Sequence, residues 1–208
     1  MSGIYIHIPF CRQACSYCDF YFITRQTLLP DYINKLCSRI KSKKNSPQAA
    51  ETVNTLYIGG GTPSLLKAEY IHQILEALHE TFELNLQEFT FEINPDDLSA
   101  DYLESLKTAG VTRPSMGIQS FQPELLQFMH RAHNREEAIK SLDMLTSAGF
   151  STFSVDLIYG NPGQSVEALE KDIEKLLSFS PPHISAYSLT IEPRTRLGKQ
   201  VKLGRLKP

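Results

Sequence analysis

Residues 4–18 read Ile-Tyr-Ile-His-Ile-Pro-Phe-Cys-Arg-Gln-Ala-Cys-Ser-Tyr-Cys, an apolar run that Pro9 ends and the loop that follows it. The apolar run is rich in β-branched residues and predicts a buried strand. The loop carries Cys11, Cys15 and Cys18 at CxxxCxxC spacing. Thiolates are soft ligands that select iron–sulfur clusters, zinc or copper(I), and three of them leave the fourth iron of a cubane cluster open. The stretch therefore predicts a strand with a metal centre at its carboxyl end.

Two other uses of the cysteines compete with a cluster. His7 stands four residues before Cys11 and could complete a zinc site of three cysteines and one histidine, which is a common structural ligand set. A disulfide is less favoured, because three of the cysteines lie within residues 11–18 and the N-terminus has no apolar segment that would direct export. Cys37 falls on the inner face of a predicted helix, where we expect it to pack as a small hydrophobic residue.

The composition is that of an ordinary globular domain. The 208 residues are 41% hydrophobic, and 21 Lys and Arg against 23 Asp and Glu give a formal net charge of −2. Bulk charge therefore indicates no polyanionic partner, and no nucleic acid is expected. No run approaches the roughly 18 apolar residues that a membrane-spanning helix needs. We expect a cytoplasmic protein in a compartment that keeps thiols reduced.

Strand and helix patterns alternate along the chain, as in βα units on a parallel sheet. Apolar runs predict six strands, at residues 4–8, 56–58, 89–93, 115–118, 153–158 and 184–189. Helical spacing predicts inner faces made of Ile33, Leu36, Cys37 and Ile40; Ile71, Ile74, Leu75, Leu78 and Phe82; Tyr102, Leu103 and Leu106; Ala138, Ile139, Leu142 and Leu145; and Val166, Leu169, Ile173 and Leu176. We therefore predict an α/β fold, a partial parallel (β/α)6 barrel.

Residues that favour helix starts support these boundaries. Asn134 and Glu137 have the spacing of a capping box. The N-caps of three other helices are assigned to Asp31, Ser99 and Ser165. A short helix and turn are expected within residues 122–133.

The sequence changes character after the sixth predicted strand. From Glu192 onward it is rich in Lys and Arg and shows no apolar period, and a helix to follow the last strand is missing. We therefore expect residues 1–190 to form the βα core and residues 191–208 to be the start of a truncated C-terminal region.

Unusual polar and small residues fall at the carboxyl ends of successive predicted strands. The cysteines follow the first strand and Gly59–Gly61 the second, while Glu92 closes the third, Gln119 follows the fourth and Asp156 lies late in the fifth. Each alone can be interpreted as a turn, an exposed charge, a loop hydrogen bond or a cap, and isolated motif matches are often false. In a parallel barrel these ends meet at one face, where active sites are assembled. Together they predict a functional site.

The chemistry of these residues fits a ligand that joins an amino acid to a nucleoside. An open iron can be chelated by an amine and a carboxylate, and glycines let backbone groups approach the amine. Glu92 can accept from the ammonium, and Arg131 can pair with the carboxylate in fork geometry. Asp156 and Gln119 suit ribose hydroxyls, and Tyr17 lies between two cysteines, where it can meet adenine. This describes S-adenosylmethionine (SAM).

The motifs resemble those of the radical SAM enzymes. They are CxxxCxYC after Tyr-Ile-His-Ile-Pro-Phe, then Gly-Gly-Gly-Thr-Pro-Ser, Glu-Ile-Asn-Pro, Gly-Ile-Gln-Ser-Phe and Asp-Leu-Ile-Tyr-Gly-Asn-Pro-Gly-Gln. More narrowly, they resemble the family of oxygen-independent coproporphyrinogen III oxidase and its haem chaperone branch. The resemblance implies a barrel of the radical SAM type with a [4Fe–4S] cluster on Cys11, Cys15 and Cys18. It implies SAM contacts from Tyr5, Gly60, Gly61, Thr62, Glu92, Gln119, Arg131 and Asp156, with Tyr17 and Ile158 beside the adenine.

The resemblance also implies a role in haem metabolism. Oxidases of this family carry a further cysteine two residues after the third, whereas Asp19 and Phe20 follow Cys18 here. This difference favours the haem chaperone branch, whose members bind haem and pass it to respiratory enzymes. In the family, one electron from the reduced cluster cleaves SAM to methionine and a 5′-deoxyadenosyl radical. Whether this chain turns over as an enzyme stays open.

The implied partners are haem or a porphyrin, an electron donor such as a flavodoxin-type protein, and a haem acceptor protein, with haem binding expected of the full-length protein. Two alternatives remain. One is an oxidase that decarboxylates coproporphyrinogen III to protoporphyrinogen IX, and the other is a zinc-stabilised βα scaffold. His7, His130 and His133 are candidate haem ligands or proton carriers, but we expect structural roles for all three, since a lone histidine more often serves the fold.

Overall fold

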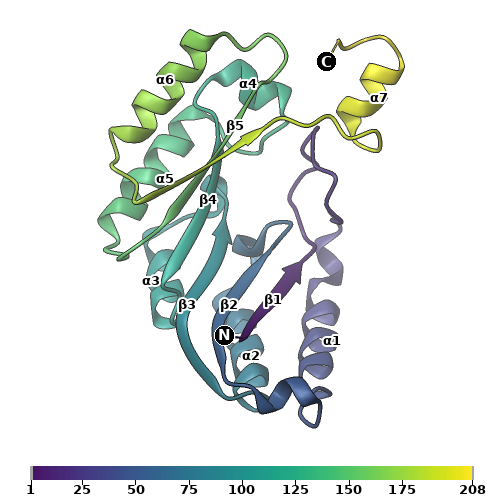
Figure 1. Cartoon of the computed structure of the whole chain (residues 1–208), viewed down its shortest axis with the longest axis vertical. Helices are drawn as coiled ribbons and strands as arrows, with labels where there is room; N and C mark the ends of the chain where they lie inside the picture. Colours follow the sequence, from purple (N-terminus) through teal and green to yellow (C-terminus); the bar gives the residue numbers. More distant parts are fainter. Residues whose placement is uncertain (1, 208) are drawn as a thin grey trace.

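A computed structural model describes residues 2–207 of the chain. Six of its segments form one sheet, whose arrangement can be followed in Figure 1. The strands lie in chain order: β1 (Ser2–Ile8), β2 (Val53–Gly60), β3 (Leu84–Ile93), β4 (Arg113–Gln119), β5 (Ser154–Tyr159) and β6 (His183–Ser188). Every neighbouring pair is parallel. The predicted α/β fold is confirmed, and each predicted strand overlaps an observed one. Because β1 and β6 do not pair with each other, the barrel is partial, as predicted.

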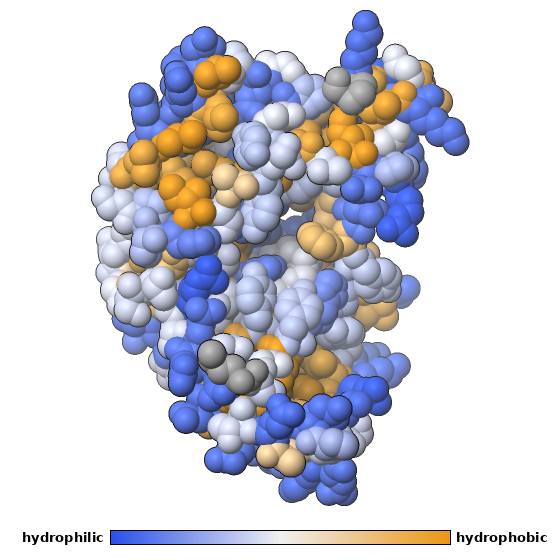
Figure 2. Space-filling view, viewed as in Figure 1, coloured by the Kyte–Doolittle hydropathy of each residue, from blue (hydrophilic) through white to orange (hydrophobic). Residues whose placement is uncertain are grey.

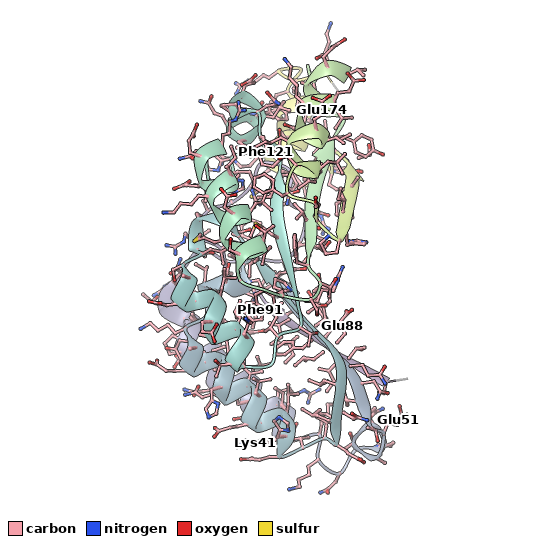
Figure 3. All side chains as sticks on the ribbon, turned by 90° about the vertical axis from the view of Figure 1, so that its left-hand side faces the viewer. Lys41, Glu51, Glu88, Phe91, Phe121 and Glu174 are labelled. Carbon is pink, nitrogen blue, oxygen red and sulfur yellow. The ribbon has the colours of Figure 1, made fainter. Side chains whose placement is uncertain are left out.

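Helices connect the strands and cover one face of the sheet, as the side view in Figure 3 shows. The crossover helices are α1 (Leu29–Lys41), α2 (Ala68–His79), α3 (Ala100–Thr108), α5 (Arg135–Ser147) and α6 (Val166–Leu177). A short helix, α4 (Pro123–Phe128), precedes α5 as expected, and α7 (Arg196–Lys202) follows β6. Single turns of 3-10 helix lie in the loops: η1 (Gln26–Leu28), η2 (Pro47–Ala50), η3 (Pro63–Leu65) and η4 (Pro95–Asp97).

The hydrophobic core lies between this face of the sheet and the helices. Ile58 of β2 and Phe91 of β3 are register partners, and both are fully buried. The helices contribute Ile74, Leu106 and Leu142, which are also fully buried. Each such side chain stabilises the fold by about 2 kcal/mol through the removal of apolar surface from water. This core fixes the strands and hence the place where their carboxyl ends meet.

Most of the predicted helix starts are confirmed. The Ser99 and Ser165 side chains accept hydrogen bonds from backbone amides three residues on, and both bonds of the Asn134–Glu137 capping box form. The prediction for Asp31 is wrong, because Leu28 is the N-cap of α1 and Asp31 lies in the first turn. There it interacts with the positive end of the helix dipole instead of capping.

The predicted inner face of α6 is also partly wrong. Leu176 is buried, but Val166 is 68% exposed and Ile173 39% exposed. Asp172 is buried in their place, with 1% of its surface exposed. Hydrogen bonds to the loop after β4 make this burial favourable, and apolar spacing alone cannot reveal such bonds.

The C-terminal segment contains a helix that the sequence pattern did not indicate. Leu197 of α7 is 1% exposed, and its backbone N–H donates to the Ser16 carbonyl at 3.0 Å. A two-turn helix that buries one leucine leaves too little apolar period to be recognised. The division into residues 1–190 and 191–208 stays a prediction. Within residues 2–207, no helix has the length and apolar character needed to span a bilayer.

Candidate functional site

A cavity of about 620 Å³ opens at the carboxyl ends of the strands. Figure 2 shows the molecule hollowed on this side, between the β6 side and the loop after β1. Every predicted site residue except Tyr5 lines the cavity: Cys11, Cys15, Tyr17, Cys18, Gly60, Gly61, Thr62, Glu92, Gln119, Arg131, Asp156 and Ile158. The structure thus brings together residues that span almost 150 positions of the sequence. Their roles as ligands stay predictions.

Tyr5 is the exception to this convergence. Its side chain is 58% exposed, and its hydroxyl group forms a hydrogen bond with His7 Nδ1 at 3.0 Å. Its ring packs at 5.7 Å from that of Tyr57, whose hydroxyl contacts Glu92. Tyr5 therefore lies one residue removed from the cavity wall, and the structure gives its predicted SAM contact no direct support.

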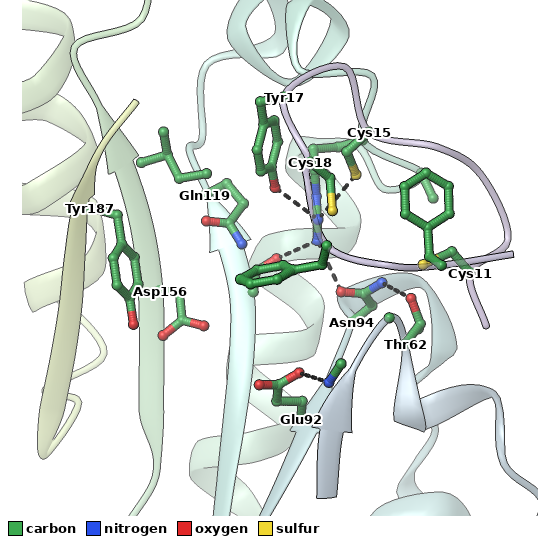
Figure 4. A pocket seen from close by; sticks show the side chains of 18 of the residues that line it. Cys11, Cys15, Tyr17, Cys18, Thr62, Glu92, Asn94, Gln119, Asp156 and Tyr187 are labelled. Atoms are coloured by element: carbon green, nitrogen blue, oxygen red, sulfur yellow. Dashed lines mark hydrogen bonds between the residues drawn. The ribbon is translucent and has the colours of Figure 1, made fainter. Parts of the chain in front are cut away.

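The three cysteines of the loop after β1 are free and half-buried, and they face the same cavity (Figure 4). Burial raises the pKa of the Cys11 thiol to about 11 and also raises that of Cys18. The Cys15 sulfur accepts a hydrogen bond from Arg131 Nη1 at 3.6 Å. In residues 2–207, no three His, Cys, Asp or Glu side chains are grouped closely enough to hold one ion. The sulfurs are thus spread around the loop and are not gathered about a single point.

The cysteine loop is held by the far end of α4 and by its own base. The Ser16 backbone N–H donates to the Met129 carbonyl at 3.0 Å, and the Ser16 hydroxyl donates to the Phe128 carbonyl at 2.8 Å. Gln13 Nε2 donates to the His130 carbonyl at 2.8 Å. At the base, the Cys11 N–H donates to the Ile23 carbonyl. These bonds fix the path of a loop that has no regular structure.

The three histidines have the structural roles that we expected. His7 bonds Tyr5 through Nδ1 and the Tyr21 carbonyl through Nε2, so both ring nitrogens are engaged away from the cysteines. The His133 ring bonds the Ile118 carbonyl, and burial lowers its pKa to about 3. The ring of His130 bonds the Ala14 carbonyl. The alternative of a zinc site with three cysteines and one histidine gains no support, because its proposed fourth ligand does not face the cavity.

The glycine turn after β2 packs directly against the cysteine loop. Gly60 has φ +119°, and a Cβ there would lie 2.6 Å from His7 Nδ1. A Cβ on Gly61 would lie 2.7 Å from the Phe10 carbonyl oxygen and 3.0 Å from the Cys11 sulfur. Any side chain at either position would therefore push the two segments apart.

Glu92 is fixed by two donors from the chain itself. Its Oε1 accepts from the Tyr57 hydroxyl at 2.7 Å. Its Oε2 accepts from the Gly60 N–H at 3.0 Å, the bond drawn at Glu92 in Figure 4. Burial and the negative charge of Glu92 together raise the pKa of Tyr57, so that phenol remains a donor. The carboxylate keeps free lone pairs with which to accept from a ligand.

Arg131 joins several parts of the cavity. Its Nη2 donates to Asn94 Oδ1 at 3.0 Å and to the Gly117 carbonyl at 2.8 Å. Its Nη1 approaches Tyr17 Oη at 3.4 Å as well as Cys15. The guanidinium is therefore used largely within the protein, whereas the sequence suggested a free fork for a carboxylate. That predicted role is not tested by the structure.

The β4–β6 side of the cavity carries polar groups that the chain leaves less satisfied. Gln119 has φ +70°, and its Oε1 is buried without a hydrogen-bond partner in the described part of the chain. Burial, together with the nearby charge of Glu92, raises the pKa of Asp156 to about 6. Ile158 packs with Tyr17 in a small apolar cluster over α4.

Several residues of the site were missed by sequence reasoning. Asn94 links Arg131 to Thr62, to whose hydroxyl its Nδ2 donates at 3.3 Å. Asp97 Oδ1 forms an ion pair with Arg12 Nη2 of the cysteine loop at 2.7 Å, and Asp97 Oδ2 accepts a hydrogen bond from the Ser64 hydroxyl at 2.7 Å. The Asn-Pro-Asp-Asp run after β3 was a usable signal, because Asn and Asp at a strand end favour side-chain hydrogen bonds to loops. Tyr187 also lines the cavity, and no pattern in β6 marked it.

Comparison with known proteins agrees with this geometry. The chain is 39% identical over 213 residues to the haem chaperone HemW of Bacillus subtilis, covering 99% of this chain and 55% of that protein. It is 38% identical over 201 residues to HemW of Escherichia coli, covering 95% and 53%. The chain spans about half the length of these curated relatives.

A solved structure and a family model also match most of this chain. Coproporphyrinogen III oxidase (HemN) from Escherichia coli superposes with a TM-score of 0.85 at 29% identity, over 97% of this chain and 46% of that one. This likeness agrees with a partial barrel of the radical SAM type. Residues 5–176 match the radical SAM superfamily. Because that match covers most of β1, all of β2 to β5 and most of the residues that line the cavity, the chain belongs to the radical SAM superfamily.

Proposed function

We propose that this chain is the cluster- and SAM-binding part of a haem chaperone. Membership of the radical SAM superfamily implies a [4Fe–4S] cluster and SAM. The observation that carries the finer proposal is the identity of 38–39% to HemW proteins over almost the whole chain. The same proposal includes haem or a porphyrin as ligand, a flavodoxin-type electron donor and a haem acceptor protein.

The residues of the loop after β1 fit such a cluster. Three thiols, from Cys11, Cys15 and Cys18, line one cavity, and a donor set of three thiolates suits iron–sulfur chemistry. Gly61 offers no side chain beside the Cys11 sulfur, and Arg131 donates a hydrogen bond to the Cys15 sulfur at 3.6 Å. When bound and reduced, a cluster with an open iron supplies single electrons to SAM. The protein's own part is to orient both ligands and to exclude water.

The proposed SAM site uses the cavity residues in separate roles. Glu92, held by Tyr57 and Gly60, would accept from the ammonium of SAM, and the free Oε1 of Gln119 and the carboxylate of Asp156 would accept from ribose hydroxyls. Tyr17 and Ile158 offer an apolar surface for adenine. The remaining proposed contacts are Tyr5, Gly60, Gly61, Thr62 and Arg131.

A porphyrin is supported by aromatic side chains at the mouth of the cavity. Phe20 is 74% exposed and Tyr187 is 56% exposed, and both line the opening. Exposed aromatic side chains that gather at one cavity opening offer an apolar surface to a ligand. A flat apolar ring system is a ligand that they could cover.

A second function has one specific observation in its favour. The structural match to coproporphyrinogen III oxidase has a TM-score of 0.85, which is compatible with oxidative decarboxylation of coproporphyrinogen III. Asp19 and Phe20 stand where the resemblance to the oxidases calls for a further cysteine. We therefore rank the oxidase second.

Anaerobic reconstitution with iron and sulfide tests the cluster and the SAM site together. We expect iron and sulfide to be retained with a broad visible absorption, and the electron paramagnetic resonance spectrum of the reduced sample to change when SAM is added. Retention of zinc without iron or sulfide would instead support the zinc-stabilised scaffold.

Haem and coproporphyrinogen III separate the two haem-related functions. A chaperone should bind added haem, seen as a Soret shift, and release it to apomyoglobin as a model acceptor. An oxidase should form protoporphyrinogen IX from coproporphyrinogen III in the presence of SAM and dithionite. Formation of that product without stable haem binding would overturn the chaperone proposal.

A further inference from the structure

Asp172 is a buried carboxylate that the proposed SAM site does not use. It lies in α6 and exposes 1% of its surface, although its neighbours Ile173 and Val166 on the same helix are exposed. Burial of an ionised carboxylate is costly unless hydrogen bonds compensate it. An acidic residue at such a position therefore calls for specific partners.

The partners of Asp172 all come from three consecutive residues of the loop after β4. Its Oδ2 accepts from the Ser120 hydroxyl at 2.5 Å, while its Oδ1 accepts from the Phe121 N–H at 3.0 Å and from Gln122 Nε2 at 2.8 Å. The Ser120 oxygen in turn accepts from the Gln122 N–H at 3.0 Å. One side chain of α6 thus fixes the whole of this short connection.

The residue just before this connection is Gln119, and its backbone is strained. Its φ of +70° is in the left-handed region, which costs a non-glycine residue about 1–2 kcal/mol. The β4–β5 register shifts between Gly117 and Gln119, where Gln119 pairs with Leu157, and the Ser120 N–H donates to the Ile118 carbonyl at 2.9 Å across a tight turn centred on Gln119. Its side chain lines the cavity with Oε1 unpartnered in the described residues. The turn therefore depends on the position of Ser120, the residue that Asp172 binds.

The same connection leads into the helix that supports the cysteine loop. Gln122 is the N-cap residue of α4, and the carbonyls of Phe128 and Met129 at its other end receive the hydroxyl and N–H of Ser16. The connection therefore lies between the Gln119 side of the cavity and the loop that carries the thiols.

We infer that Asp172 is a positioning residue, which holds Gln119 in its left-handed conformation and so sets the affinity of the cavity for SAM. The inference rests on the proposed function for its ligand. It assigns a role at the site to a helix residue on the far side of the sheet from the cavity.

The test compares Asp172→Asn with Glu174→Gln, a matched change at an exposed position of the same helix. The Asn side chain keeps the shape but lacks the charge, and its NH2 group opposes one of the donors. We expect the backbone amides of residues 119–122 to exchange hydrogen about tenfold faster, since bonds to a charged acceptor are lost. The amides of β2 and β3 should be unaffected. This measurement needs neither cluster nor SAM.

The second readout is SAM affinity in the reconstituted protein. Asp172→Asn should raise the Kd for SAM by about tenfold, with iron and sulfide content unchanged. Its effect should be less than additive with that of Gln119→Ala, because both act on the same contact. Glu174→Gln should leave exchange and Kd unchanged.

Several results would overturn the inference. Faster exchange spread evenly over the sheet would indicate a general loss of stability, and an unchanged Kd or full additivity with Gln119→Ala would separate Asp172 from the site. If Asp172→Asn does not fold, Ser120→Ala replaces it in the test. This change removes one donor to Asp172, so amide exchange and the Kd for SAM should change in the same direction but less. If wild-type protein retains no SAM, the proposed function is wrong, while the exchange experiment still decides whether Asp172 holds Gln119.

Discussion

The two walls of the cavity differ in how far the protein satisfies its own polar groups. On the β1–β3 wall, Glu92 receives two donors from the chain, and Asn94 bonds Thr62. On the β4–β6 wall, Gln119 has a buried oxygen with no partner in residues 2–207, and the pKa of Asp156 is raised by burial. The polar groups of the first wall thus have hydrogen-bond partners within the protein. Those of the second wall keep acceptors that a ligand could bond.

This difference follows from how the loops at the carboxyl ends of the strands pack. On the β1–β3 wall the glycine turn after β2 packs against the cysteine loop and brings the Gly60 N–H to Glu92. On the other wall the residues of β6 are mostly exposed, so the ligand cavity is more open there. We therefore expect changes on the β1–β3 wall to affect assembly and changes on the β4–β6 wall to affect binding.

The largest effect should come from the cysteine loop. Cys15→Ser should abolish cluster assembly, because two thiolates cannot hold a cubane that needs three. Much of the fold should remain, since the loop lies outside the hydrophobic core. Iron and sulfide analysis after anaerobic reconstitution measures the loss. The matched control is Cys37→Ser on α1, which should keep a full complement; equal iron in both variants would contradict the assignment.

Arg131→Ala should have the second largest effect, because Arg131 contacts residues of both walls. Removal of the guanidinium leaves the Asn94 oxygen and the Gly117 carbonyl without their donor, which should lower the free energy of unfolding by about 3 kcal/mol. Urea denaturation measures this change, with Arg135→Ala on α5 as an exposed control. SAM should bind more weakly while iron content stays intact. Unchanged stability together with unchanged SAM affinity would place Arg131 outside the site.

Asp156, on the β4–β6 wall, should make the affinity for SAM depend on pH. The charges that act on Asp156 are those of Glu92, Arg113 and Arg131, and its pKa is about 6. An ionised carboxylate accepts more strongly from ribose hydroxyls than a protonated one, so SAM affinity should fall by up to about tenfold when the pH is lowered from 7 to 5. Asp156→Asn should remove this slope, and titrations across that range check it. An identical slope in the variant would assign the titration to another group.

The raised pKa of Asp156 also predicts how its contribution to stability changes with pH. Because the folded-state pKa of Asp156 is above its unfolded value of 3.8, the folded state binds more protons between pH 4 and pH 6. Its contribution to stability is present at low pH and is lost as the pH rises through about 6. Asp156→Asn should therefore raise the Tm at pH 7.5 and leave it nearly unchanged at pH 3.5. A lower Tm at pH 7.5 would contradict the raised pKa.

The smallest effect on stability should come from the exposed ion pair between Arg194 and Asp19. Arg194 is 83% exposed at its side chain and pairs with Asp19 at 3.0 Å. Solvent screens exposed ion pairs, so Arg194→Ala should leave the free energy of unfolding nearly unchanged. Denaturation at low and high salt measures it, and a loss as large as that of Arg131→Ala would show that this ion pair helps to hold the cavity wall together.

Local patterns were enough to predict much of the architecture. Strand runs, the capping box at Asn134 and the N-caps at Ser99 and Ser165 are decided by neighbouring residues, and the structure has them all. The convergence on one cavity was predictable too, because parallel strands end at a common face.

What the sequence did not reveal depends on contacts between distant segments. The burial of Asp172 requires donors some 50 residues earlier in the chain, and the docking of Leu197 requires the loop near Ser16. Arg131 seemed free for a ligand because Asn94 and Gly117 are far from it in sequence. Periodicity describes only one element at a time, so tertiary hydrogen bonds of this kind leave no local pattern.

The contact between α7 and the cysteine loop has a consequence for biosynthesis. The N–H of Leu197 reaches the Ser16 carbonyl, yet about 180 residues separate the two in the chain. At ribosomal speeds of about 5–20 residues per second, the loop emerges on the order of ten seconds or more before α7 is made. During translation the thiols are therefore carried for that time by a loop on which α7 has not yet docked.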